Sequence, residues 1–310
     1  MAREDTTYDR TAPQSEGIGT LPDIKSIYQS QKEVFRGQPL GQFGLFIFLA
    51  FLLIGLFAPF LAPYGADDVM RGDEGEVLRY DAPSTDHLLG TTQYGRDVAS
   101  QVILGTRMSL MVGFIAAFIT VTLGTLVGLL AGYYGGIVDS VLMRITDIAY
   151  GIPFLPFLIV LVIMLGASFS SIVIGISVLM WRASARVIRS QVLTVKQRPY
   201  IEAAKATGVS DRRLIIRHLL PNVLPLTFLY IAFAVNIAIL AEASLAFLGF
   251  GDPNSVSWGT MLFEAYNADA HRHGWWWIIT PGVALSLIVI SVFSIARAYE
   301  RLTNPELEAQ

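Results

Sequence analysis

Three long stretches of this chain carry no charged side chain. Residues 37–66, 108–138 and 148–181 contain no Asp, Glu, Lys or Arg, and 15% of all residues are charged. A typical soluble domain is about 25% charged. A water-soluble core that buried such runs needs more polar covering than this chain supplies. The sequence therefore predicts a polytopic membrane protein.

Six apolar segments are long enough to cross a bilayer. A spanning helix needs about 20 mostly apolar residues, and these continuous runs lack the strict alternation of a barrel strand. The expected fold class is an all-α membrane protein with six transmembrane helices. The predicted spans are residues 43–62, 109–131, 148–166, 171–191, 222–248 and 275–296. Pro153 and Pro156 are expected to kink the third span.

Basic residues are concentrated on one side of the predicted spans. Residues 182–221 hold nine Lys or Arg against two acidic residues, whereas residues 63–108 hold eight acidic residues against four arginines. Cytoplasmic loops are enriched in Lys and Arg, so the basic segment is predicted to be cytoplasmic. Both termini then lie inside, in a multi-pass protein of the cytoplasmic membrane.

The chain is predicted to have five parts. They are a cytoplasmic segment (1–42), the first span (43–62), an extracytoplasmic segment (63–108), a five-helix core (109–298) containing the basic loop 192–221, and a cytoplasmic tail (299–310). Within the first part, Ile24, Ile27, Tyr28 and Phe35 recur at helical spacing, which suits a helix lying on the inner membrane surface. A partner-binding helix is the alternative.

Several functions are excluded by what the sequence lacks. There is no cysteine, so disulfides and thiolate metal sites are excluded. A net charge of −3 gives no support for nucleic-acid binding. No Gly-x-x-x-x-Gly-Lys-Ser/Thr motif is present to cradle a phosphate. We therefore expect no cofactor or metal in this chain, and any ATP and Mg must be bound by a partner subunit.

The most informative motif lies in the basic loop. Residues 202–207 favour a short helix with the small side chains of Ala203 and Ala204 on its surface. Gly208 is suited to end this helix because glycine accepts a left-handed conformation. A second helix is expected to follow and to stop where Pro221 opens the fifth span. Such a projecting pair of helices suits docking to another protein, although an ordinary surface hairpin is the alternative.

This loop resembles that of the permease subunits of ABC importers. Their signature is Glu-Ala-Ala, three residues, Gly, nine residues, Ile, one residue and Leu-Pro; His218 stands here at the isoleucine position, as fits the peptide-permease branch. The resemblance implies a type I ABC importer permease fold whose cytoplasmic coupling helices sit in a groove of a separate ATPase. The residues assigned to ATPase coupling are Glu202, Ala203, Ala204, Gly208, His218, Leu220 and Pro221.

Further stretches are similar to the C-type permease of dipeptide and oligopeptide importers. They lie within residues 87–110, 132–147 and 240–260, and Thr92 stands where that family usually has Asp. The resemblance implies a homologous B-type permease, two ABC ATPase subunits or domains, an extracytoplasmic peptide-binding protein and a peptide substrate. The candidate contacts with the binding protein are Gly90, Thr91, Gly95, Arg96 and Asp97.

Two side chains well inside the predicted fifth span are candidates for a functional role. Glu242 and Asn236 each have two interpretations, as groups lining the translocation path or as hydrogen-bonding groups between helices. At the boundaries of other spans, an arginine stripe (Arg182, Arg186, Arg189) and three tryptophans (Trp275, Trp276, Trp277) are expected to anchor the helices to the lipid headgroups.

Three alternatives stay open. Relatives of this branch also import nickel complexes or oligosaccharides. A secondary transporter driven by an ion gradient needs buried ionisable relays or inverted repeats; the sequence shows one buried carboxylate and no convincing repeat. An intramembrane enzyme needs paired catalytic groups at membrane depth, which the predicted spans lack.

Overall fold

The computed structural model describes residues 38–303, with side chains described up to residue 298. Within this range the chain is helical, apart from connecting loops that contain two isolated β-bridges. The helices are α2 (Pro39–Leu61), α3 (Val98–Tyr134), α4 (Gly136–Gly151), α5 (Phe154–Leu165), α6 (Phe169–Lys196), α7 (Pro199–Ala206), α8 (Asp211–Leu214), a π-turn (Ile215–Leu219), α9 (Leu220–Leu245), a second π-turn (Ala246–Phe250), α10 (Trp258–Asn267), α11 (Ala270–His273) and α12 (Trp275–Thr303). The predicted surface helix and most of the predicted tail lie outside the described residues.

Five described helices are long and apolar enough to cross a membrane, and a sixth candidate is a bent pair. The all-α prediction is thus confirmed for the described residues. The predicted third span, 148–166, does not form one continuous helix: where the sequence predicted a kink, a bend of 90° separates α4 from α5. Pro153 disfavours helical geometry at the preceding Ile152, which is extended at φ −85° and ψ 123°. The 12 residues of α5 reach about 18 Å, short of a hydrocarbon core of about 30 Å.

Side-chain caps define the starts of α3 and α6, both of which begin earlier than predicted. α3 starts at Val98 instead of residue 109, because the Asp97 carboxylate accepts a hydrogen bond from the Ser100 backbone N–H at 2.7 Å and so caps the helix. α6 starts at Phe169 instead of residue 171, with the Ser168 hydroxyl as its cap. Side-chain caps therefore determine where α3 and α6 start, whereas hydropathy alone predicted starts that lie further along each helix.

The fifth span is continuous with the helix before it. Asp211–Phe250 forms one helical run, so the prediction that a separate helix stops at Pro221 is wrong. Proline lacks a backbone donor, and its ring clashes with the carbonyl four residues earlier in an α-helix. The π-turn Ile215–Leu219 directly precedes this position and widens the helix there, which accommodates the proline without ending the helix.

α3 packs unusually closely against α6 along a stripe of glycines. A Cβ atom added at Gly128 would lie 2.7 Å from the Ala185 carbonyl oxygen, and one at Gly124 would lie 1.9 Å from the Ser184 hydroxyl. Gly132 continues the stripe against Val192. Small residues spaced four apart let two helix backbones approach closely within a membrane. The backbones of α3 and α6 therefore pack closely along this stripe.

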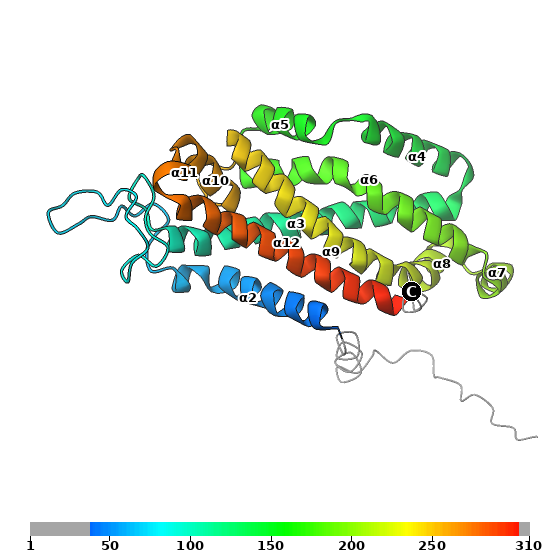
Figure 1. Cartoon of the computed structure of the whole chain (residues 1–310). Helices are drawn as coiled ribbons and strands as arrows, with labels where there is room; N and C mark the ends of the chain where they lie inside the picture. The colour runs from blue at the N-terminus through cyan, green and yellow to red at the C-terminus, as the bar shows by residue number, and fades with distance from the viewer. Residues whose placement is uncertain (1–37, 304–310) are drawn as a thin grey trace, which may run out of the picture.

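The bundle has two distinct ends (Figure 1). α2, α3, α6, α9 and α12 run side by side; α7 and α8 lie at one end, here called the α7 end. α10, α11 and the loop of residues 62–97 lie at the other, here called the α10 end. α2 begins and α12 ends at the α7 end. The two ends thus present different candidate interaction surfaces.

Candidate functional site

α7 forms a short elbow that projects from the bundle. It begins at Pro199, which suits a first helical position, and it is followed by Gly208 in the left-handed region at φ 79°. The Val209 N–H donates to the Ala204 carbonyl at 3.2 Å and closes the turn. The predicted helix end at Gly208 is therefore confirmed. Glu202 and Ala203 are exposed.

The elbow is fixed to the ends of α3 and α6. Ile201, Leu214 and Leu219 are fully buried in an apolar cluster with residues of α3 and α6. The Tyr133 hydroxyl of α3 donates a hydrogen bond to the Asp211 carboxylate at 2.5 Å, which joins the start of α8 to the end of α3. α7 and α8 are therefore packed directly against two spans.

The residues predicted to couple to an ATPase divide into two groups. The exposed members are Glu202, Ala203, Gly208 and Pro221, whereas Ala204, His218 and Leu220 are half-buried. Ala204 and Leu220 pack against the same apolar cluster, so the cluster joins the start of the motif to its end. The structure thus brings together residues that are far apart in the motif.

The arginine stripe of α6 has protein partners. Arg189 forms a two-pronged pair with Asp139 of α4, at 2.5 and 2.6 Å, and Arg186 pairs with Asp147 at 2.5 Å. Arg182 donates to the Ala149 carbonyl at 2.9 Å. The stripe therefore fastens α4 to α6, where the sequence predicted lipid anchors. The sequence showed the charges but not that α4 folds back against them.

Replacing Asp139 with Asn should destabilise the chain by about 1–2 kcal/mol, because it weakens a two-pronged charge-assisted pair. The matched control is Asp147→Asn on the same helix, whose pair with Arg186 is about half exposed (47% and 59%) and is worth about 0.5 kcal/mol. Thermal unfolding of the purified chain in detergent measures both. Equal shifts in the two variants would contradict this ranking.

The candidate binding-protein contacts at the α10 end are mostly internal. Gly90, Thr91, Gly95 and Asp97 are buried within this chain, and Arg96 is half-buried. The prediction that they contact a partner is thus corrected for the four buried residues, whose role is to shape the loop. They were misassigned because a motif does not reveal which of its residues point inward.

This loop is held against the start of α12. Trp276 donates its indole N–H to the Thr91 carbonyl at 3.1 Å, and a Cβ at Gly90 would lie 2.7 Å from that indole nitrogen. The Tyr80 hydroxyl donates to the Ala268 carbonyl between α10 and α11. Trp276 and Trp277 are buried, which corrects the prediction that all three tryptophans form a membrane-interface belt.

A second set of polar contacts closes the turn before α3. The Thr92 hydroxyl accepts hydrogen bonds from the Tyr94 and Arg96 N–H groups, at 3.2 and 3.1 Å, as an Asp carboxylate in this position does. The Asp97 carboxylate contacts the His87 ring at 3.1 Å, and both are buried. The Thr92 hydroxyl therefore closes the turn at the position where the resemblance led us to expect Asp.

The polar residues of the fifth span face other helices. The Asn236 amide donates to the Val289 carbonyl of α12 at 3.3 Å, which favours the interhelical interpretation. Glu242 is 1% exposed, and its Oε2 atom has no hydrogen-bond partner among the described residues. It lies beside Ser257, whose hydroxyl caps α10. Glu242 thus lies at the junction of α9 and α10.

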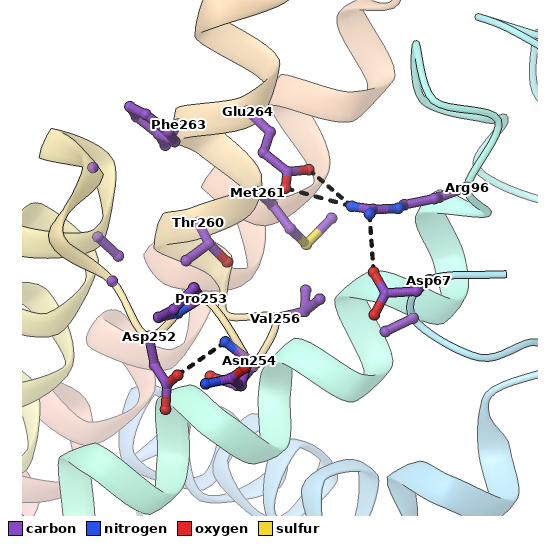
Figure 2. Close-up of a pocket in the computed structure, with 15 residues that line it drawn as sticks. Asp67, Arg96, Asp252, Pro253, Asn254, Val256, Thr260, Met261, Phe263 and Glu264 are labelled. Carbon is purple, nitrogen blue, oxygen red and sulfur yellow. Dashed lines mark hydrogen bonds and ion pairs between the residues drawn. The ribbon is translucent and has the colours of Figure 1, made fainter. Parts of the chain in front are cut away.

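A pocket opens at the α10 end between the loop of residues 62–97 and α10 (Figure 2). Arg96 reaches between two carboxylates, 3.0 Å from Asp67 and 3.4 Å from Glu264. Burial raises the pKa of Glu264, and Arg96 opposes that rise only in part. The pocket is therefore lined by charged groups, and the Arg96 guanidinium is shared between the carboxylates of Asp67 and Glu264.

Comparison with known proteins identifies the family. The model of the family described as "Binding-protein-dependent transport system inner membrane component" matches residues 124–305, more than half of the chain. The chain belongs to this family. Residues 30–82 also match the family described as the N-terminal TM domain of oligopeptide transport permease C. The resemblance based on the Glu-Ala-Ala motif is thus confirmed, and this protein is a membrane component of a binding-protein-dependent transport system.

Two relatives cover most of this permease. The dipeptide transport system permease protein DppC of Bacillus subtilis (strain 168) is 35% identical, covering 86% of this chain and 82% of the relative. The glutathione transport system permease protein GsiD of Pectobacterium atrosepticum is also 35% identical, covering 80% and 83%. A solved structure of the MetNI methionine ABC transporter, facing inward, has 20% identity and a TM-score of 0.49, covering 64% of this chain and 96% of that one.

Proposed function

We propose that this chain is the C-type permease of an ATP-driven importer of small peptides. A homologous B-type permease completes the translocation path, two ABC ATPase subunits or domains bind ATP and Mg, and an extracytoplasmic binding protein delivers the peptide. The α7 end then faces the cytoplasm, and the α10 end faces outward. The peptide class rests on the relatives, among which are a dipeptide and a glutathione permease.

One observation carries the proposal beyond the family. α7 presents Glu202 and Ala203 to solvent while Ile201, in the same helix, is buried in the cluster that joins α3 and α6. Small exposed residues allow close approach of another protein, and the buried cluster transmits movement to the spans. ATP binding by the partners therefore biases the spans between two arrangements through this elbow.

Reconstitution tests this function. Proteoliposomes that contain this chain, the B-type permease and the ATPases should take up a labelled dipeptide when ATP is enclosed on the ATPase side and the binding protein is supplied outside. Uptake should stop when this chain is omitted, and it should persist in the presence of an ionophore. Uptake that needs no ATP and collapses with the ion gradient would contradict the proposal and favour a secondary transporter.

A further inference from the structure

The pocket at the α10 end is built from stretches that are far apart in the sequence. Asp67 and Arg96 come from the loop of residues 62–97, Asp252 from the turn after α9, and Glu264 from α10. The cavity has a volume of about 330 Å³ and opens to the surface. That volume is enough for one long side chain of a second protein.

The charges that line this pocket do not balance. Asp67, Asp252 and Glu264 face a single cation, Arg96. Asp252 is already satisfied by neutral donors, the backbone N–H groups of Phe169 and Asn254, at 3.0 and 2.9 Å. The acidic excess is therefore concentrated at Asp67 and Glu264.

The contact between Arg96 and Glu264 is loose. The guanidinium nitrogen lies 3.4 and 3.5 Å from the two Glu264 oxygens, whereas a close charge-assisted bond measures about 2.7–2.9 Å. Arg96 is shared, because its other nitrogen lies 3.0 Å from Asp67. Glu264 is two-thirds buried (33% exposed side chain) and is thus only partly compensated.

Apolar side chains complete the pocket wall. An uncompensated charge in a cleft with low-dielectric walls produces a stronger local field than the same charge on an open surface. Val256, Met261 and Phe263 supply the apolar part of the lining. The pocket thus offers carboxylates for a cation and apolar surface for the stem that carries it.

We propose that this pocket receives a lysine or arginine side chain of the extracytoplasmic binding protein when that protein docks. This inference rests on the proposed function. The aliphatic stem packs along the apolar lining, and the cationic head reaches Glu264 and Asp67, relieving the shortage of cations there. A complementary charge pair of this kind fixes the orientation of the docked partner more than it adds affinity.

The test measures the affinity of the fluorescently labelled binding protein for the assembled complex in nanodiscs. Glu264→Gln and Asp67→Asn are each expected to raise Kd about tenfold, which corresponds to about 1.4 kcal/mol. Asp67 is 80% exposed, so its variant leaves folding intact even if the other does not. Asp86→Asn, an exposed acid of the same loop outside the pocket, is the matched control and should change Kd less than twofold.

Three outcomes would overturn the inference. Pocket variants within twofold of the parent would show that no cation docks there. An equal loss in Asp86→Asn would show a diffuse charge effect. A loss seen only with peptide-loaded binding protein would assign the cation to the amino group of the peptide. Copurification of the ATPases with the unmodified chain reports the proposed function separately, so the two failures are distinguishable.

Discussion

Gly128→Ala is expected to cost about 3 kcal/mol or more of folding free energy and to abolish transport. The new Cβ would lie 2.7 Å from the Ala185 carbonyl oxygen, 2.8 Å from Ile188 Cβ and 2.9 Å from the Arg189 nitrogen. Two of these atoms belong to the backbone of α6 and cannot rotate away. The helices must therefore separate, which also loosens the base of the elbow.

Gly282→Ala in α12 is the matched control for this substitution. No atom lies within 4 Å of a Cβ at that position, and alanine favours a helix over glycine by about 1 kcal/mol. We expect this variant to unfold at the same temperature as the parent or slightly higher. Thermal unfolding in detergent and ATP-driven uptake measure both variants. Similar melting temperatures for the two would disprove close packing of α3 on α6.

Gly208→Val is expected to abolish ATP-driven uptake while the chain still inserts into the membrane and folds. The residue occupies the left-handed region at φ 79°, which costs an ordinary side chain about 1–2 kcal/mol and a β-branched one more. A Cβ there meets no atom of this chain within 4 Å. The backbone strain therefore changes the direction in which α7 projects, and the packing of the bundle stays intact.

Gly208→Asn distinguishes two possible requirements at this position, a left-handed backbone and the absence of a side chain. Asparagine tolerates the left-handed conformation, so this variant should keep its elbow geometry and much of its uptake if only the backbone matters. Loss of uptake in both variants would indicate that an ATPase approaches the glycine closely. Gly151→Val, at a position with no neighbour within 4 Å and no positive φ, should transport normally. Normal uptake by Gly208→Val would refute the coupling role of the elbow.

The approximate positions of five spans were predictable, because each depends on a local run of apolar residues. α2 and α12 begin within a few residues of the predicted starts at 43 and 275. The break at Pro153 was predictable in kind, as a kink, but its angle was not. The α3 and α6 boundaries depend on caps at Asp97 and Ser168, which hydropathy does not detect.

The candidate site was predictable only where one short segment determines its geometry. The turn at Gly208 follows from its own neighbours. The pairing of Arg189 with Asp139, and of Arg96 with Glu264, depends on how distant segments meet, which periodicity does not encode. The burial of Thr91 and Trp276 also depends on the meeting of distant segments, since the two residues contact each other at the α10 end.

Cross-linking from position 203 tests the central claim most directly. The chain has no cysteine, so Ala203→Cys supplies a single thiol on the exposed face of α7. In the reconstituted complex this thiol should cross-link to an ATPase subunit, whereas the thiol of Asp86→Cys at the α10 end should not. Two results together would contradict the coupling role of α7. One is that Ala203→Cys never cross-links to an ATPase subunit, and the other is that an impermeant maleimide labels both single-thiol variants from the same side of the membrane.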